Sequence, residues 1–227
     1  MSTHNGRPAL TRRTVIEAAL RLLDETGLDG LTVRRLAADL GVQSPALYWH
    51  FRTKQELLDG MADVIVLDAG MGPPADGESW QDWLARRTRA YRASLSSHRD
   101  GARVVTNARD LSPATLQKLD EELSAMVRCG FSPALALRTI AALSQYTNGF
   151  VLAEQSHSPT TPPPPTDPAA DQLAALAGLL AEGMSATLIT ALRESGGAGG
   201  DEAFEHGLRT FIDGTATALT LQNTPTK

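Results

Sequence analysis

The segment from Leu31 to Leu58, LTVRRLAADLGVQSPALYWHFRTKQELL, constrains the fold of this chain more than any other stretch. Apolar residues recur at helical spacing after Thr32, whose hydroxyl can cap a helix, and Gly41 ends that run because glycine adopts the left-handed conformation of a C-terminal cap without steric cost. Ser44 offers a second cap, and Pro45 fits the first turn of a helix, where its missing N–H would have no partner. Two short helices joined by a glycine turn are the layout of a helix-turn-helix, which places its second helix in the major groove of DNA.

A third helix is predicted in front of this pair. Thr11 can cap a run over residues 12–26 whose apolar side chains share one face, and Gly27 ends it. The second helix of the pair has barely two turns, so packing against its neighbours has to stabilise it. The sequence therefore predicts a compact helix-turn-helix head over residues 11–58, preceded by a flexible arm over residues 1–10.

Glycine and proline breaks divide the rest of the chain into further helical runs. These runs cover residues 54–68, 80–95, 102–109, 113–129, 133–151, 173–192 and 204–219. In the fourth run, five apolar residues are expected to form the buried face, namely Leu116, Leu119, Leu123, Met126 and Val127. Alanine and leucine dominate while aromatic residues make up 5% of the chain, so the predicted fold class is all-α, with a larger helical domain over residues 59–227.

A proline-rich tract, SPTTPPPPTDP, occupies residues 158–168. Four consecutive prolines favour an extended conformation, so an exposed loop is predicted, with a ligand for a proline-binding domain as the alternative. The two helical runs that follow form a hairpin with more apolar surface than one hairpin can bury. Pairing with the same hairpin of a second chain would give a four-helix bundle, so a homodimer is expected.

Charge is unevenly distributed along the chain. Residues 1–60 hold eight Lys and Arg against seven Asp and Glu, whereas residues 61–227 hold 13 against 19. Affinity for DNA must therefore come from a few placed cations rather than from bulk charge. These cations are Arg7, Arg12, Arg13, Arg34, Arg35, Arg52 and Lys54.

Other classes of protein are disfavoured by the sequence. The single cysteine, Cys129, cannot form an internal disulfide, and neither a secretory segment before Thr11 nor a spanning apolar stretch is present, so a cytoplasmic protein is expected. His98, His157 and His206 lie on separate segments, and no nucleophile elbow, phosphate loop or H-E-x-x-H pattern occurs. We therefore expect no catalytic site, no metal site and no cofactor.

The head sequence GLDGLTVRRLAADLGVQSPALYWHFRTKQELLD resembles the DNA-binding domain of TetR-type repressors, and of the tetracycline repressors in particular, with LYWHF as its most specific element. The stretches GESWQDWL, HRDGARV, CGFS and ALSQYTNGFVLAEQ are similar to parts of the body of the same family. The resemblance covers most of residues 11–157 and, more loosely, the last two helical runs. It implies a homodimer that binds a palindromic DNA operator.

On this resemblance, ten residues of the head are expected to contact DNA. Arg34 would reach a guanine edge with two hydrogen bonds, Gln43 would read adenine or guanine, and Ala46 would touch a thymine methyl. Trp49 has a core position as its alternative, and His50 has a structural role as the alternative to a phosphate contact. The full set is Thr32, Arg34, Gln43, Ser44, Pro45, Ala46, Tyr48, Trp49, His50 and Lys54.

The body departs from the family where the drug is held. Tetracycline repressors grip a magnesium-chelated drug through histidines, an asparagine, a glutamine and an acidic residue, whereas the matching positions here hold Arg87 for the asparagine and Val105 for a metal-binding histidine, and the glutamine position falls near Glu122. An aliphatic side chain cannot replace the imidazole, so a different effector is expected. Arg87 and Glu122 either pair, lie on a solvated face or meet a charged ligand. By matching positions, the expected effector-binding residues are Arg87, Tyr91, Val105, Asn107, Arg109, Glu122, Met126, Gln145, Tyr146 and Asn148.

The sequence thus predicts a ligand-responsive repressor that binds its operator as a homodimer. A small-molecule effector other than a magnesium–tetracycline chelate is expected to release it. The alternative is a DNA-binding regulator without any small-molecule effector, and release of DNA by small apolar compounds would distinguish the two.

Overall fold

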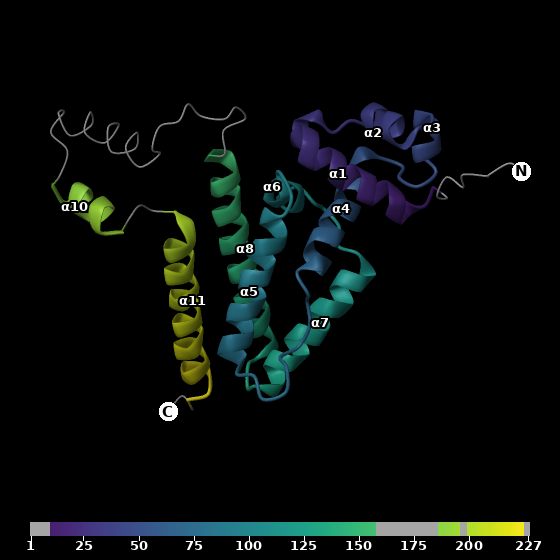
Figure 1. Cartoon of the computed structure of the whole chain (residues 1–227). Coiled ribbons are helices and arrows are strands. Elements are labelled where there is room, and N and C mark those ends of the chain that lie inside the picture. The colour runs from purple at the N-terminus through teal and green to yellow at the C-terminus, as the bar shows by residue number, and fades with distance from the viewer. Residues whose placement is uncertain (1–9, 158–185, 196–198, 225–227) are drawn as a thin grey trace, which may run out of the picture.

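The computed structural model describes residues 10–157, 186–195 and 199–224, and every regular element among them is an α-helix (Figure 1). The predicted all-α fold class is confirmed. Residues 1–9 of the predicted arm, the proline-rich tract 158–168 and most of the predicted helix 173–192 lie outside the described residues. In the described part of the chain, no helix has the length and apolar character needed to cross a membrane.

The head begins with α1 (Arg12–Gly30), which starts at the predicted cap. The Thr11 hydroxyl accepts a hydrogen bond from the backbone N–H of Thr14, and the Thr14 hydroxyl accepts one from the backbone N–H of Thr11. At Gly27 the backbone leaves the helical region with φ 70° and ψ 172°, so the predicted end of the helix is a kink followed by one last turn.

The first helix of the predicted pair is α2 (Val33–Leu40), and both of its predicted ends are confirmed. The Thr32 side chain accepts a hydrogen bond from the backbone N–H of Arg35, which satisfies a donor that the first helical turn leaves unpaired. Gly41 has φ 61° and ψ 37°, the left-handed conformation of a C-terminal cap. The turn toward the next helix therefore forms where the glycine predicts it.

The second helix of the pair, α3 (Ser44–Leu47), corrects two predictions. It has four residues rather than nearly two turns. The helix starts at Ser44, near the predicted position, but Ser44 is its first residue rather than its cap, because Gln43 is the N-cap and no side-chain capping bond forms. The Gln43 carbonyl accepts a hydrogen bond of 2.9 Å from the N–H of Ala46, which closes the first turn ahead of the serine.

The body consists of longer helices. They are α4 (Lys54–Asp68), α5 (Trp80–Ser96), α6 (Gly101–Thr106), α7 (Pro113–Arg128), α8 (Pro133–His157), α10 (Ala186–Ser195) and α11 (Gly200–Gln222). The hydroxyls of Thr53, Ser79 and Ser112 cap α4, α5 and α7. The helix predicted over residues 102–109 ends earlier, at Thr106, because the chain turns there to bring α7 against α4.

Helix α4 joins the head to the body. The predicted domain boundary after residue 58 falls within this helix. The helix runs from the head toward the centre of the body (Figure 1). One apolar core extends from the head helices through α4 and α6 to Tyr91 and Val151. Helix α4 therefore packs in the same core as the head and part of the body.

The buried face of α7 differs from the predicted one. Of the five predicted residues, Met126 is buried and Leu119 and Leu123 are partly buried, but Leu116 and Val127 are exposed. Thr115 and Glu122, which the apolar pattern does not include, are buried instead. Two polar contacts explain the rotation of the helix: the Thr115 hydroxyl donates to Asp63 Oδ1 over 2.7 Å, and Glu122 pairs with an arginine of α5. The periodicity of apolar residues alone does not predict these buried polar contacts.

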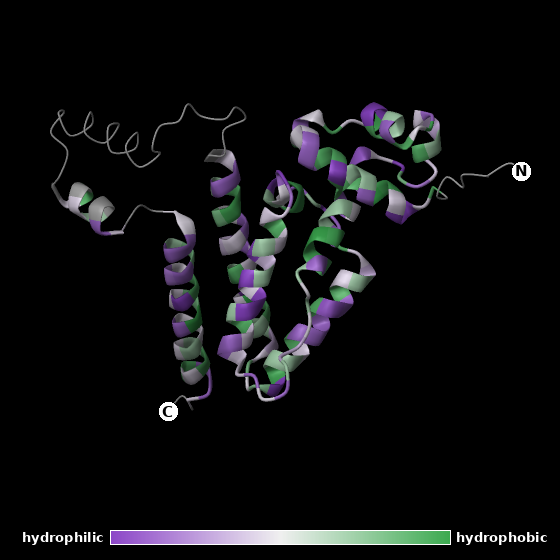
Figure 2. Ribbon diagram, in the orientation of Figure 1, coloured by the Kyte–Doolittle hydropathy of each residue, from purple (hydrophilic) through white to green (hydrophobic). Residues whose placement is uncertain are grey.

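Helix α11 packs against α5 and α8. Its side toward α8 is predominantly hydrophobic (Figure 2), and Phe204 and Leu208 are fully buried there in a second core that includes Trp83, Met126 and Phe131. The predicted hairpin would pair this helix with residues 173–192, of which the structure describes only the part within α10.

Candidate DNA-binding surface and internal cavity

The predicted DNA-contact residues lie on one stretch of the head from α2 to the start of α4. Among them, Thr32, Arg34, Gln43, Pro45, Tyr48, Trp49 and Lys54 are exposed, and Ser44, Ala46 and His50 are half-buried. The structure thus leaves the side chain of each predicted DNA-contact residue at least partly accessible, while their roles toward DNA remain predictions.

The aromatic run LYWHF divides between the core and the surface. Leu47 and Phe51 are 4% exposed and belong to the core of the head. Trp49 is 89% exposed, which excludes the core position left open for it, and Tyr48 is also exposed. A large aromatic side chain so fully accessible just after α3 is available to a partner surface.

The cations of the head separate into two groups. Arg12 is bound to other residues of the head, because it pairs with Glu56 over 2.8 Å and lies over the ring of Phe51 at 4.3 Å. Arg13 pairs with Glu17 over 2.7 Å. Among the cations expected to provide DNA affinity, four are exposed and form no ion pair within the described chain, namely Arg34, Arg35, Arg52 and Lys54.

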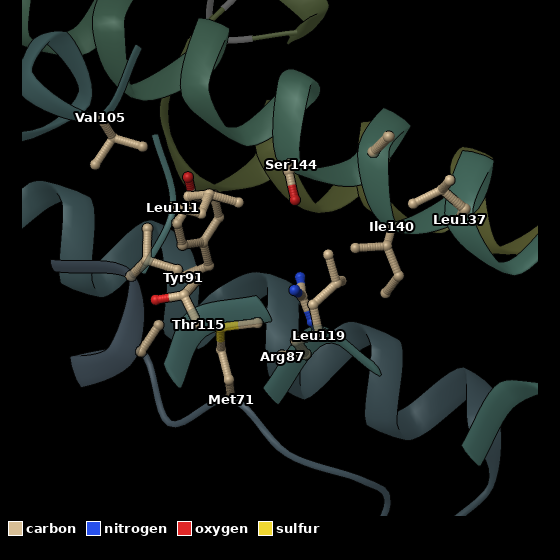
Figure 3. Close-up of a pocket in the computed structure, with 13 residues that line it drawn as sticks. Met71, Arg87, Tyr91, Val105, Leu111, Thr115, Leu119, Leu137, Ile140 and Ser144 are labelled. Atoms are coloured by element: carbon tan, nitrogen blue, oxygen red, sulfur yellow. The ribbon is translucent and has the colours of Figure 1, made fainter. Parts of the chain in front are cut away.

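The body contains a cavity of about 230 Å³ between α4, α5, α6, α7 and α8, which is partly open to solvent (Figure 3). Nine of its lining residues are aliphatic, and the other four are Arg87, Tyr91, Thr115 and Ser144. The aliphatic residues are Val66, Ala69, Met71, Val105, Leu111, Leu119, Leu137, Ile140 and Ala141. Of the ten predicted effector-binding residues, Arg87, Tyr91 and Val105 therefore line this cavity.

A buried ion pair forms part of the wall. Arg87 donates from Nε and Nη2 to Glu122 Oε2 over 2.9 and 2.8 Å, and the side chains are 10% and 0% exposed. The other carboxylate oxygen of Glu122 accepts the N–H of Gly72 at 3.1 Å, while the carbonyl of Gly72 accepts the indole N–H of Trp83. Of the three roles left open for Arg87 and Glu122, the structure shows the internal pair.

Tyr91 is fixed across the cavity by Asn148, since its hydroxyl donates to Asn148 Oδ1 over 2.9 Å. Burial raises the pKa of Tyr91 above its usual value, and the hydrogen bond with Asn148 only partly opposes this, so the hydroxyl is protonated at neutral pH. Asn148 thus holds a residue of the cavity wall without lining the cavity itself.

The remaining predicted effector residues lie elsewhere. Met126 is buried in the second core, Gln145 is exposed on α8, and Tyr146 stacks on Phe204 of α11 with ring centroids 5.4 Å apart. Asn107 and Arg109 are exposed and use backbone atoms to bind α4. None of these five lines the cavity.

The segment after α6 attaches the cavity wall to α4. The carbonyl of Asn107 accepts a hydrogen bond from Gln55 Nε2, and the N–H of Arg109 donates to Asp59 Oδ1, both over 2.9 Å. A further N–H, that of Ser112, donates to Asp63 Oδ1. The side chains of Val105 and Leu111 on this segment line the cavity. The segment that carries part of the cavity wall is therefore connected to α4 by short contacts at Gln55, Asp59 and Asp63.

The head is also held to the body at the end of α1. Arg103 of α6 forms two hydrogen bonds with Asp29, of 2.8 and 2.9 Å, which hold the pKa of that carboxyl below its usual value. The side chain of Asp100 accepts the N–H of Leu28 at 2.8 Å. Asp24 accepts the N–H of Arg99 at 3.0 Å. These contacts join the head to the segment that begins α6.

The residues around the cavity do not fit a magnesium chelate. Magnesium prefers oxygen ligands and retained waters, but the Glu122 carboxylate is already bound by Arg87 and Gly72. No imidazole lines the cavity. Over the described ranges, no three His, Cys, Asp or Glu side chains gather closely enough to hold a metal ion.

Comparisons with known proteins identify the family. A family model described as "Bacterial regulatory proteins, tetR family" matches residues 15–61, and one described as "Tetracyclin repressor-like, C-terminal domain" matches residues 73–219. The chain is 37% identical over 212 residues to the tetracycline repressor protein class D of Escherichia coli, which covers 93% of this chain and 91% of the relative.

Solved structures show the same likeness. Apo ActR from Streptomyces coelicolor matches with a TM-score of 0.76 and 27% identity, over 94% of this chain and 98% of that one. The class A TetR in complex with 5a,6-anhydrotetracycline and magnesium matches with a TM-score of 0.65 and 33% identity, over 92% and 99%. The family resemblance predicted from the sequence is thereby confirmed. The chain belongs to the TetR family of bacterial transcriptional regulators, with an N-terminal helix-turn-helix domain and a tetracycline repressor-like C-terminal domain.

Proposed function

We propose that this protein is a ligand-responsive transcriptional repressor that binds a palindromic operator as a homodimer and is released by a small molecule in the internal cavity. One observation carries the proposal: α4 lines the cavity with Val66 and Ala69 near its end and forms part of the core of the head near its start. A ligand that favours one position of this helix changes the position of the head.

The release mechanism follows from the contacts of α4. A ligand that displaces Val105 and Leu111 acts on the segment whose backbone binds Gln55 and Asp59. Because Gln55 lies in the first turns of α4, that displacement moves the head of each subunit and changes the spacing of the two recognition helices. Only the difference in ligand affinity between the two states drives this change.

The homodimer is proposed to form around α11. Leu221 is 70% exposed on this helix, and Phe211 is partly exposed. The end of the helix is fixed to the body, because Gln222 accepts the N–H of Ser132 and donates to the carbonyl of Gly130. A rigid helix with exposed apolar residues and an open position at Gly214 suits close packing against its twofold copy.

The effector is proposed to differ from a magnesium–tetracycline chelate. The class A TetR structure contains such a pair of ligands, and the class D relative is a tetracycline repressor. In this chain, Val105 lines the cavity where a metal-binding histidine is expected, and Arg87 closes on Glu122. These two differences support a changed effector.

A regulator without any small-molecule effector is the second candidate. Arg87, Tyr91 and Thr115 already form hydrogen bonds with protein groups. This observation favours the second candidate, because these side chains need no ligand as a partner. A panel of small apolar compounds added to the protein–DNA complex separates the candidates. Release by a member of the panel supports the sensor, and retention of DNA with every compound supports the second candidate.

Two substitutions in the head test its proposed role. Arg34→Ala is expected to weaken binding to the preferred operator about 5- to 150-fold, corresponding to about 1–3 kcal/mol, and to relax the preference at one base pair. Lys54→Ala is expected to weaken binding to all sequences and to reduce the slope of log K against log salt by about one. Fluorescence anisotropy on operators selected from random duplexes measures both effects.

Thermal unfolding supplies the control for these variants. Arg34 and Lys54 are exposed and form no ion pair with described residues, so neither substitution is expected to change the unfolding midpoint appreciably. Unchanged operator affinity in both variants would show that another surface binds DNA.

A further inference from the structure

We propose that the effector is an uncharged, mainly apolar molecule with a single hydrogen-bonding group, and that Ser144 binds this group. This inference rests on the proposed function of the cavity as the effector site. It adds the chemical class of the ligand and the residue that orients it.

The size and lining of the cavity limit the ligand. At about 230 Å³ the cavity lies just below the range of about 300–1,000 Å³ that is typical of sites for drug-sized ligands. Aliphatic side chains from α4, α6, α7 and α8 surround it, among them Val66, Leu119 and Ile140. A small molecule with an extensive apolar surface gains most from transfer into such a site.

The charge of the wall excludes an ionic ligand. Arg87 is the only charged residue that lines the described cavity, and its guanidinium is neutralised by the fully buried Glu122 at 2.8 Å. A ligand anion would have to compete with this carboxylate, and a ligand cation would face the guanidinium. Burying an unpaired charge is costly, so the site selects against both.

Three of the four polar lining residues already have protein partners. Arg87 binds Glu122, Tyr91 donates to Asn148, and Thr115 donates to Asp63. Ser144 is the exception: its hydroxyl forms no hydrogen bond with any described residue. It does not bond back to its own helix, as Thr147 of α8 does with the carbonyl of Leu143 over 2.7 Å.

Figure 3 shows the orientation of this hydroxyl. Ser144 Oγ points from α8 into the cavity, and the guanidinium nitrogens of Arg87 point into it from the opposite wall. A hydroxyl can donate or accept. A ligand with one carbonyl, hydroxyl or amine group therefore gains a hydrogen bond to Ser144, while its apolar part fills the aliphatic remainder of the cavity.

Two fluorescent probes with the same ring system test the charge selectivity. N-phenyl-1-naphthylamine is neutral with one N–H donor, and 8-anilino-1-naphthalenesulfonate adds a sulfonate to the same skeleton. The full-length protein is titrated with each probe. Ala141→Phe fills the cavity, so only the part of the fluorescence signal that this variant loses is counted as binding in the cavity. Ala114→Phe, on the exposed start of α7, adds the same ring outside the cavity as the control.

The neutral probe is expected to saturate one site per chain, and the sulfonate to bind there at least about tenfold more weakly. Ser144→Ala is expected to weaken binding of the neutral probe about two- to tenfold, the usual loss for one hydrogen bond. Ser124→Ala, at an exposed position of α7, is expected to leave this binding unchanged. Equal or tighter binding of the sulfonate, or no cavity-dependent binding of the neutral probe, would overturn the proposed ligand class. Unchanged binding in Ser144→Ala would overturn the role of the hydroxyl.

Operator affinity measured on the same samples separates this inference from the proposed function. Wild-type protein that binds an operator but fails the probe test contradicts the ligand class alone. Wild-type protein that selects no operator contradicts the proposed function, whichever probe it binds. Thermal unfolding of each variant confirms that a loss of binding comes from the cavity rather than from misfolding.

Discussion

Glu122→Gln is expected to lower the free energy of unfolding by about 3–5 kcal/mol, because it leaves the buried guanidinium of Arg87 without a counter-charge. The Glu122 side chain is fully buried and joins three elements through Arg87 of α5, the N–H of Gly72 and its own helix α7. Glutamine keeps the size of the side chain but presents an amide with only one acceptor oxygen. Urea denaturation followed by circular dichroism measures the change.

Glu121→Gln is the matched control on the same helix. Glu121 pairs with Lys118 over 2.8 Å, and both side chains are exposed, so solvent screens the pair and the denaturation midpoint should hardly change. The double variant Arg87→Met with Glu122→Leu should recover most of the lost stability, since it removes both charges from the core. A loss for Glu122→Gln no larger than that for Glu121→Gln would contradict the buried pair.

Gly214→Trp is expected to separate the proposed homodimer and to reduce operator affinity about 100- to 10,000-fold, because a monomer engages one half-site at a time. A Cβ at Gly214 meets no atom within 4 Å, so the subunit has open space for a larger side chain. An indole on this side of α11 would keep the twofold-related helix at a distance. Sedimentation velocity should show about 24 kDa, the mass of one chain, instead of twice that value.

Ser124→Trp provides the comparison for this prediction. Ser124 is exposed on α7, away from α11, and gains the same side chain. This variant should remain dimeric and bind the operator like the wild type. A dimeric Gly214→Trp protein with full operator affinity would place the interface on another surface.

The head could be predicted closely because its boundaries are set by local chemistry. Thr11, Thr32 and Gly41 act within one turn of their own positions, through a capping hydroxyl or a left-handed backbone. The start of α3 near residue 44 is predicted correctly, but its cap is not. The Gln43 carbonyl closes the first turn, and Ser44 and Pro45 do not decide which of the two adjacent residues is the N-cap.

The cavity was harder to predict because it depends on helix rotation and on contacts between distant residues. Arg87 and Val105 were found from matching positions, but Ser144, Leu119 and Met71 were missed. Each of these residues lies among apolar residues of the sequence. The sequence pattern therefore does not distinguish a residue of a cavity wall from a residue of an ordinary core. The polar partners of α7 fix its rotation, and these partners are more than 30 residues away in the sequence.

The most direct test measures, by fluorescence anisotropy, whether small molecules release the selected operator from the wild-type protein. Uncharged apolar compounds are titrated into the complex in one series, and tetracycline is titrated with and without magnesium chloride in a second. We expect at least one compound of the first series to release the DNA, and tetracycline to leave the complex intact whether or not magnesium is present. Release by tetracycline that requires magnesium would contradict the account, because it would show that the cavity accepts the chelate despite Val105 and the Arg87–Glu122 pair.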